Sequence, residues 1–263
     1  TAPMAAMFGY GGDQQMHHTK GRRRELADNC RAKKIPLITF DGGLLSSFGN
    51  ISTSPDHHFR VSLYTPMNDG NFLSDNSPND RWEMLVKKFD VKYEPWRKSN
   101  QNDPIIFVMQ PKDNWSMNEL DPIDWFNGVY EKLRPATDRK FIVRPHPNNV
   151  SNILERENEL PDDVEIQYTQ KHFKGDEKKY YRFHFQEAIA NAHAVVTHNS
   201  TASVDSCIRG IPTFCTSDLA LCWDVCNKDL NDIETPKTPD RTQWVNDLGY
   251  KLWSIQESKV GAG

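Results

Sequence analysis

The strongest constraint on the fold is a regular alternation of short apolar runs with helix-like segments between residues 104 and 215. The run at 104–110 (PIIFVMQ) is continuously apolar, which is typical of a strand buried on both faces. Further strands are predicted at 140–144, 164–168, 194–197 and 211–215, and helices at 121–133, 152–159, 180–192 and 201–209. Strands that alternate with helices in this way predict an α/β fold with a parallel, doubly wound sheet.

The first hundred residues predict a second, shorter α/β unit. Its strands are expected at 4–8, 36–40 and 58–65, and its helices at 21–33 and 79–89. We therefore expect an N-terminal domain over 1–95 and a C-terminal domain over 104–235, joined by a linker rich in Pro, Asn and charge. The segment 240–257 is expected to be a helix that packs back on the N-terminal domain.

Composition argues against a membrane protein and against a generally basic surface. No apolar stretch approaches the roughly 18 residues of a membrane span, and the net charge is −4. The basic run Arg22-Arg23-Arg24 is more often a solvated helix face than a nucleic-acid site. Residues 1–10 lack the pattern of a signal peptide, so we expect a cytoplasmic protein.

The five cysteines are an odd number, which suits reduced thiols. Cys222 and Cys226 have a spacing close to that of metal ligands, but Cys207 and Cys215 offer no second close pair. We therefore expect these thiols to be buried structural groups, with no metal site.

The loop after the predicted strand at 194–197 suits an anion. His198-Asn199-Ser200-Thr201 leads into a helix, and the backbone N–H groups at a helix start attract phosphate. The alternative is that Ser200 or Thr201 only caps the helix, and the residues alone do not decide between the two. Asp205 follows one turn later, where its carboxylate could accept ribose hydroxyls.

A second loop, Arg144-Pro145-His146-Pro147, ends another strand of the same predicted sheet. Its prolines stiffen the loop and hold Arg144 and His146 in fixed directions. Ligands of such sheets bind beyond the carboxyl ends of the strands, which selects the loops after Gln110, Arg144 and Thr197. Arg and His side chains at this edge suit a diphosphate.

Asp41 is a candidate catalytic group because it follows an apolar strand and precedes Gly42 and Gly43. A carboxylate there suits a general base or a nucleophile, and the glycines would let a ligand approach the backbone. However, Asp-Gly is also a strong turn pair, and spacing alone favours the turn.

Taken in order, these residues resemble four motifs of bacterial capsule glycosyltransferases, especially the capsule Kdo transferases of the wider GT-B group. The stretch 40–46 (FDGGLLS) is similar to their E-D-G-F-x-R-S segment, with Phe40 and Leu45 in place of its first acidic residue and its Arg. The other three likenesses are Gln110, Asp113 and Ser116 to G-Q-x-x-D-x-x-S, His146-Pro147 to H-P, and residues 200–212 to S-x-x-G-F-E-A-L-x-x-G-x-P.

The resemblance implies a GT-B-like fold of two Rossmann-like domains facing a cleft, with a short or truncated N-terminal domain. It implies transfer of a sugar from a nucleotide sugar to an acceptor hydroxyl, without a metal or any cofactor beyond that co-substrate. Asp41 and His146 would be catalytic. The donor would contact Gln110, Asp113, Ser116, Arg144, His146, His198, Asn199, Ser200, Thr201 and Asp205, and the acceptor side would include Gly11, Gly12, Arg22, Gly42 and Gly43.

The acceptor stays open at this point. The ending 244–253 (WVNDLGYKLW) resembles that of tailed-phage glycosyltransferases, some of which decorate hydroxymethylated pyrimidines in phage DNA. With Arg22–Arg24, it makes modified DNA in a host cytoplasm the first hypothesis. A capsule or surface glycan is the second. A different class is a nucleotide-sugar-binding or epimerase-like protein that makes no glycosidic bond.

Overall fold

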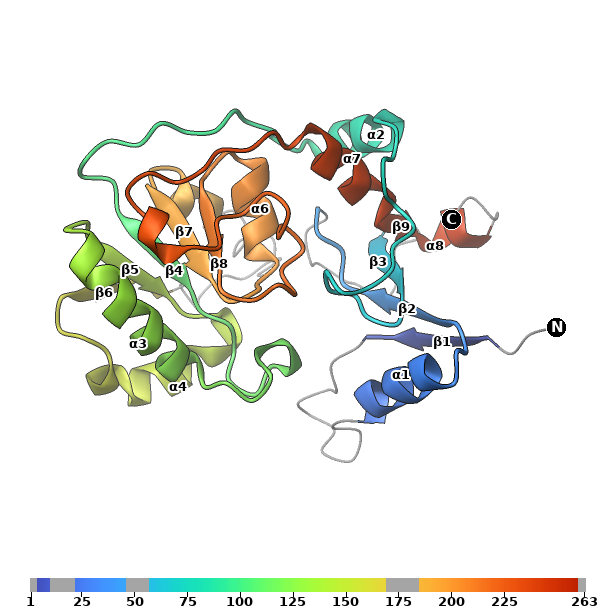
Figure 1. Cartoon of the computed structure of the whole chain (residues 1–263), viewed down its shortest axis with the longest axis horizontal. Coiled ribbons are helices and arrows are strands. Elements are labelled where there is room, and N and C mark those ends of the chain that lie inside the picture. Colours follow the sequence, from blue (N-terminus) through green and yellow to red (C-terminus); the bar gives the residue numbers. More distant parts are fainter. Residues whose placement is uncertain (1–3, 10–21, 46–56, 169–184, 260–263) are drawn as a thin grey trace, which may run out of the picture. The chain divides into compact units, whose positions relative to one another are not determined.

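The computed structural model describes residues 4–9, 22–45, 57–168 and 185–259. The chain divides into two compact units (Figure 1). The first unit combines Thr1–Val91 with Asp240–Gly263, and the second unit is Lys92–Pro239.

The second unit is built on a parallel sheet of five strands. They are β4 (Ile105–Val108), β5 (Phe141–Arg144), β6 (Val164–Ile166), β7 (Ala194–Thr197) and β8 (Thr213–Cys215). Their order in the sheet is β6-β5-β4-β7-β8, and all neighbours are parallel. The predicted parallel sheet is therefore confirmed. Its order reverses between β4 and β7, which is the switch point where such sheets bind ligands.

Successive side chains of a strand point to opposite faces of the sheet, and in these strands both sets are largely apolar. Helices therefore cover both faces. On one face α3 (Pro122–Leu133) places Phe126 against Phe107, with ring centroids 4.8 Å apart. The predicted start of α3 is confirmed, since the Asp121 carboxylate accepts the Ile123 N–H at 2.9 Å and Pro122 is the first helical residue. On the other face Ile106 packs with Ile189 and Ile211.

The remaining elements of the second unit are short. They are α4 (Val150–Glu155), α6 (Ala202–Ile208) and the 3-10 turns Trp115–Met117, Arg134–Ala136, Pro147–Asn149, Glu157–Glu159 and Leu230–Asp232. The helix predicted at 180–192 begins outside the described residues, and 185–189 are helical. In the described part of the chain, no helix has the length and apolar character to cross a membrane.

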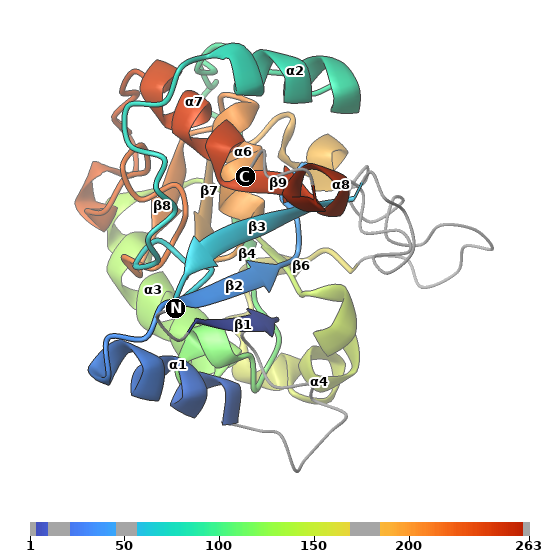
Figure 2. The ribbon, with the colours of Figure 1, turned by 90° about the vertical axis from the view of Figure 1, so that its right-hand side faces the viewer.

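The first unit has a mixed sheet in the order β1-β2-β3-β9 (Figure 2). Its strands are β1 (Ala5–Phe8), β2 (Leu37–Asp41), β3 (His58–Leu63) and β9 (Leu252–Ser254). Only β1 and β2 are parallel, and α1 (Arg22–Ala32) connects them. The expected Rossmann-like character therefore applies to this β1-α1-β2 part, because the other two pairs are antiparallel and need no helical crossover.

The prediction of one helix over 240–257 is wrong. The segment forms α7 (Thr242–Tyr250), β9 and α8 (Ile255–Lys259). Near its end, α7 approaches α2 (Asp80–Phe89) closely at Gly249. A Cβ at Gly249 would lie only 2.9 Å from the Trp82 backbone nitrogen. The next residues pair with β3 instead, and Leu252 and Ser254 are buried there.

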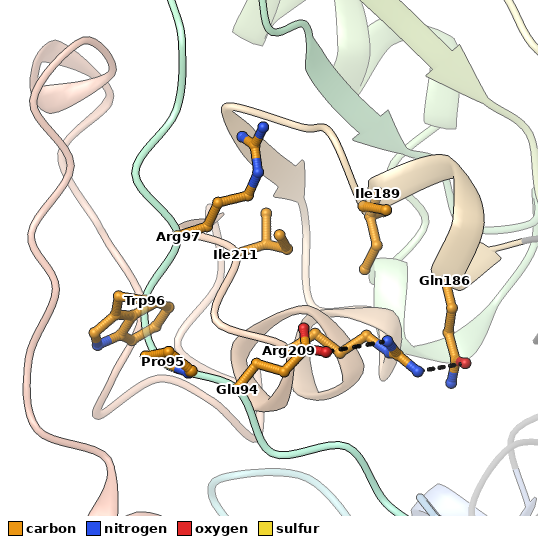
Figure 3. A pocket seen from close by; sticks show the side chains of 9 residues that line it. Glu94, Pro95, Trp96, Arg97, Gln186, Ile189, Arg209 and Ile211 are labelled. Carbon is orange, nitrogen blue, oxygen red and sulfur yellow. Dashed lines mark hydrogen bonds and ion pairs between the residues drawn. The ribbon is translucent and has the colours of Figure 1, made fainter.

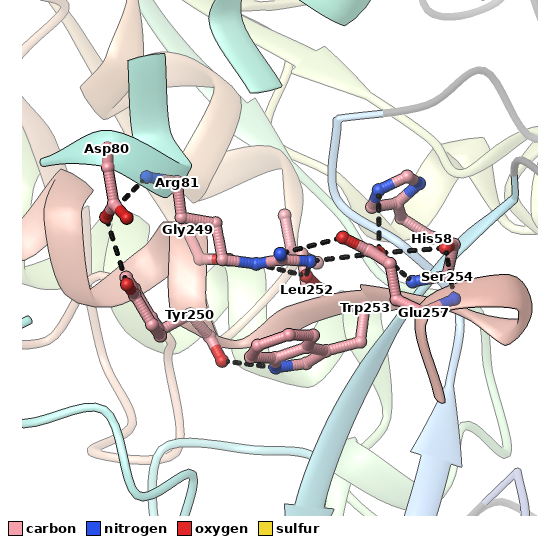
Figure 4. Close-up of polar contacts among 9 residues, drawn as sticks. All are labelled: His58, Asp80, Arg81, Gly249, Tyr250, Leu252, Trp253, Ser254 and Glu257. Carbon is pink, nitrogen blue, oxygen red and sulfur yellow. Dashed lines mark hydrogen bonds and ion pairs between the residues drawn. The ribbon is translucent and has the colours of Figure 1, made fainter. Parts of the chain in front are cut away.

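A buried arginine holds this C-terminal segment in the first unit (Figure 4). The Arg81 Nε donates to the carbonyls of Gly249 and Leu252, both at 3.0 Å, and Nη1 donates to Glu257 at 2.8 Å. The guanidinium also stacks on the Trp253 ring, 3.7 Å from its centroid. Arg81 therefore joins α2 to the end of α7, to β9 and to α8.

Candidate functional site

Three buried polar side chains meet at the switch point of the second sheet, and we call them the amide clamp: Gln110, Ser116 and Asn199. The Asn199 backbone N–H donates to Gln110 Oε1 at 3.0 Å, and Gln110 Nε2 donates back to Asn199 Oδ1 at 2.8 Å. The same Nε2 donates to Ser116 Oγ at 2.7 Å. The clamp therefore joins the loop after β4 to the loop after β7.

The N–H groups of the clamp are already used. Asn199 Nδ2 donates to the Ser116 carbonyl at 2.9 Å and to Ser217 Oγ at 3.3 Å. The side-chain N–H groups of both amides are thus taken up by protein atoms. The sequence placed these residues correctly at the carboxyl edge of the sheet, but in the structure their N–H groups fix the loops.

The start of α6 lies beside the clamp. The Ser200 hydroxyl accepts the Ala202 N–H at 3.3 Å, and its carbonyl accepts the Ser203 hydroxyl at 2.6 Å. Thr201 is the N-cap residue, but its side chain makes no capping bond. The Ser200 hydroxyl therefore accepts one N–H at the helix start, and Ser200 and Thr201 are both partly exposed, which leaves the choice between a cap and an anion site open.

His198 is held by two residues that the sequence analysis missed. Its Nδ1 lies 2.8 Å from Thr216 Oγ1, which also accepts the Trp125 N–H at 2.8 Å. Burial lowers the pKa of His198, which favours the neutral ring. The sequence could have indicated this contact through Trp125, because a mostly buried Trp needs an acceptor for its N–H.

The loop after β5 carries Arg144 and His146. Arg144 is buried and donates to Gln167 Oε1, and burial lowers its pKa to about 10, so it keeps its charge at neutral pH. Burial lowers the pKa of His146 to about 4, so its imidazole is neutral at pH 7. The loop is closed by the Asn149 N–H, which donates to the His146 carbonyl at 2.8 Å.

The sheet register brings these two loops to one edge. Arg144 pairs with Val108, and Val108 pairs on its other side with Thr197. Arg144 and Thr197 therefore lie two strand spacings apart, or about 10 Å. Asp205 lies one turn into α6 and is partly exposed, whereas Asp113 is exposed in the loop before the clamp serine and has a φ of 62°.

In the first unit, Asp41 ends β2 beside a buried cation. Its Oδ1 accepts the Gly42 N–H at 2.7 Å, and its Oδ2 lies 3.6 Å from Arg60 Nη2. Arg60 stands opposite Asp41 in β3 and donates to the carbonyls of Gly42 and Pro66. Burial lowers the pKa of Arg60, and the Asp41 charge opposes that effect. An Arg inside an apolar strand was the missed signal, since a buried charge needs a partner.

Of the expected acceptor-side residues, Gly43 is buried and Gly42 is half-buried. Gly11 and Gly12 lie outside the described residues, as does the side chain of Arg22. The neighbouring Arg23 is described, and its guanidinium lies against Gly9, where a Cβ would come within 2.9 Å of Nη1.

A cavity of about 390 Å³ in the second unit lies away from these residues (Figure 3). Its lining includes Glu94, Trp96, Arg97, Gln186, Arg209 and Ile211. All of them precede strands β4, β7 or β8, so the cavity is at the amino edge of the sheet, opposite the clamp. A cavity of about 420 Å³ in the first unit is lined by Ile38 and Phe40, which alternate with Asp41 and face the other side of their sheet.

Comparison by sequence finds no matching family model and no matching curated protein. Two solved structures from Thermosulfurimonas dismutans are similar to this chain. One is a KpsC beta Kdo 2,4 transferase, with a TM-score of 0.57 and 15% identity over 97% of this chain and 85% of that one. The other is a KpsC beta Kdo 2,7 transferase, with a TM-score of 0.50 and 13% identity over 94% of this chain and 90% of that one.

At these identities the likeness shows the fold alone. The chain has an α/β fold similar to that of these Kdo transferases, in agreement with the resemblance to capsule enzymes seen in the sequence. Neither of these two structures tests the resemblance of residues 244–253 to tailed-phage glycosyltransferases.

Proposed function

We propose that this chain is a metal-independent glycosyltransferase of the GT-B type. In this proposal the second unit binds a nucleotide sugar and the first unit presents the acceptor. The observation that carries it is the carboxyl edge of the parallel sheet at its switch point. There the loops after β5 and β7 carry polar groups suited to a nucleotide diphosphate, and the loop after β4 holds the loop after β7 in place.

The nucleotide's phosphates would lie between Arg144 and the start of α6. Arg144 supplies a positive charge, and the partly exposed Ser200 and Thr201 supply hydroxyls and backbone N–H groups. His146 is neutral before the ligand binds, so it acts first as a hydrogen-bonding group. An adjacent phosphate would favour its protonated form and let it stabilise the departing group. Asp205 would accept ribose hydroxyls.

Asp41 would act on the acceptor. As a general base, it takes the hydroxyl proton while the acceptor oxygen bonds to the anomeric carbon and the bond to the phosphate oxygen breaks. The electron pair of that bond leaves with the nucleotide. As a nucleophile, Asp41 would attack the anomeric carbon first, and the acceptor would then displace it.

The acceptor that the observations favour is a hydroxyl of a capsule or surface glycan. The four ordered motifs and the fold shared with two Kdo transferases support it. The phage-like stretch 244–253 has a structural use, since Trp244 and Leu248 are buried and Trp253 stacks under Arg81. That use weakens the case for modified DNA, which stays the second candidate.

The test is a panel of nucleotide sugars read by thermal unfolding, followed by mass spectrometry of glycan and DNA acceptors with the best binder. A ligand at 100 times its Kd adds about 2.7 kcal/mol, which raises Tm by roughly 5–10 °C. Arg144→Gln should lose this shift. Arg209→Gln, at the opposite edge of the sheet, should keep it.

Two results would contradict the proposal. The first is a panel in which no nucleotide sugar raises Tm. The second is a donor that is hydrolysed or epimerised without any acceptor, which would favour the nucleotide-sugar-binding or epimerase-like class.

A further inference from the structure

Three of the five cysteines lie together at the carboxyl end of β8: Cys215, Cys222 and Cys226. Their sulfur atoms all lie within 4.8 Å of one another, and those of Cys215 and Cys222 are 3.5 Å apart. Cys215 and Cys222 are buried and Cys226 is half-buried. All three are free thiols.

The backbone brings the three thiols together. One helical turn, in which the N–H groups of Val225 and Cys226 both donate to the Cys222 carbonyl at 2.9 Å, puts Cys222 and Cys226 on the same side. Asn227 then pairs with β8, since its N–H donates to the Thr213 carbonyl at 2.7 Å and its carbonyl accepts the Cys215 N–H at 3.1 Å. The cluster is therefore preorganised by hydrogen bonds that do not involve sulfur.

The spacing suits a thiophilic metal. Tetrahedral Zn²⁺ with Zn–S bonds of about 2.3 Å holds its sulfur ligands about 3.8 Å apart, close to the separations found here. We propose that Cys215, Cys222 and Cys226 bind one Zn²⁺ through three thiolates, with the fourth position open to solvent beside Cys226. The proposal departs from our expectation from spacing, which paired Cys222 with Cys226 and did not foresee that Cys215 would lie beside them.

The packing of the three thiols sets the charge balance of the site, because their sulfur atoms lie within 4.8 Å of one another and two of the cysteines are buried. Three thiolates cannot form here together unless a cation offsets them, so Zn²⁺ binding releases three protons. The positive charge of Lys228 acts on Cys226 and helps offset the net negative charge that results.

The site would brace the loop that supports the candidate ligand edge. Thr216 and Ser217 directly follow Cys215, and they hold His198 and Asn199 through side-chain contacts of 2.8 and 3.3 Å. The Ser217 N–H also donates to the His198 carbonyl at 3.1 Å. The metal proposal rests on the cysteines alone and does not depend on the proposed transfer reaction.

The test is a zinc titration of the full chain, stripped of metal and kept reduced, in competition with a chromophoric chelator. We expect one Zn²⁺ per chain and a higher Tm with zinc than without it. Co²⁺ in place of zinc should give the visible and charge-transfer absorption of a thiolate-bound tetrahedral ion. A chain that binds no stoichiometric zinc, with its thiols unchanged by the metal, would overturn the proposal.

Single substitutions test which of the cysteines bind Zn²⁺. Cys226→Ser, at the half-buried position, should lower Zn²⁺ affinity by at least roughly 100-fold, because losing even a group that only supports a ligand costs about 10- to 100-fold. Cys222→Ser should do the same. Cys30→Ser, at a buried cysteine of the first unit, is the matched control and should bind zinc as the natural chain does. Equal affinity in Cys226→Ser and Cys30→Ser would refute the site even if Cys222→Ser fails to fold.

Discussion

At the end of β2, two groups hold the Asp41 carboxylate. The Gly42 N–H binds one oxygen at 2.7 Å, and the Arg60 guanidinium lies 3.6 Å from the other. The first contact joins two neighbouring residues, and the second is a charge pair across two strands. Spacing alone favoured an Asp-Gly turn, but Asp41 is the last residue of β2 and neither Gly42 nor Gly43 is in a turn.

Replacing Asp41 by Asn tests its chemical role with little change in shape. The amide oxygen can still accept the Gly42 N–H, but the side chain can no longer take a proton or attack a sugar. We expect the transfer rate to fall by roughly 100- to 10,000-fold, with nucleotide affinity nearly unchanged because the proposed donor residues belong to the second unit. Turnover and calorimetric binding measure the two effects.

The matched control is Asp69→Asn, which changes a half-exposed carboxylate of the same unit and should leave turnover unaltered. A Tm close to that of the natural chain must accompany the result, since Asp41→Asn also removes the partner of a buried arginine. Turnover by Asp41→Asn within about tenfold of the natural chain would remove Asp41 from the mechanism.

His146 offers a test by titration. Burial lowers its pKa to about 4, so in the free protein the ring should become protonated only as pH falls toward that value. A bound nucleotide phosphate should raise this pKa, because a nearby anion stabilises the imidazolium. NMR titration of the ring with and without the best-binding nucleotide measures the shift. An unchanged pKa at saturating nucleotide would show that His146 does not contact the phosphates.

Among the elements, the amide clamp couples the loops that follow β4 and β7. Gln110→Ala removes the partner of the buried Asn199 backbone N–H and Oδ1, which costs about 1–3 kcal/mol and roughly 2–12 °C in Tm. Nucleotide affinity should fall too, because the loops that form the ligand edge are no longer fixed. Gln186→Ala, which removes a bond to Arg209 at the opposite edge, is the control. Equal nucleotide affinity in the two variants would mean that the clamp only stabilises the fold.

The ion pair between Arg81 and Glu257 should make the stability of the first unit decrease in acid. Burial raises the pKa of Glu257, but hydrogen bonds from Arg81 and Ser254 outweigh it and lower the pKa to about 2. The pair therefore contributes stability above the ordinary value of 4.5, and this contribution is lost as pH falls from there toward 2. Partial exposure of Glu257 keeps the effect small.

Unfolding measured across this pH range checks the sign. Glu257→Gln should be less stable than the natural chain at pH 7 and should lose less stability on acidification. Glu25→Gln, at an exposed position of α1, should follow the natural chain at every pH. Parallel pH profiles for the natural chain and Glu257→Gln would show that the pair contributes nothing.

The local part of the fold could be predicted from the sequence. The strand at 194–197 was predicted with the bounds that the structure gives, and the Asp121-Pro122 start of α3 is correct, because both depend on neighbouring residues. Contacts between distant residues could not be predicted. β9 forms because β3 offers it an edge, and Gln110 meets Asn199 across 89 positions of the chain. The same holds for Arg60 beside Asp41 and for Cys215 beside Cys222, where no local pattern announces the partner.

On the scale of the whole molecule, the acceptor separates the two candidate functions. The shared fold supports a glycan acceptor, whereas the DNA hypothesis needs a surface that binds phosphates in a chain of net charge −4. If Arg22, Arg23 and Arg24 each bind one phosphate, log affinity for duplex DNA should fall with log salt at a slope of about −2.7. We expect the slope for the natural chain to be no steeper than that for a variant in which Arg22, Arg23 and Arg24 are all changed to Gln. We also expect mass spectrometry to find the added sugar on a carbohydrate acceptor. A steep slope that the triple variant abolishes, together with sugar on digested hydroxymethylated DNA, would reverse this choice and make Arg22–Arg24 the DNA contact.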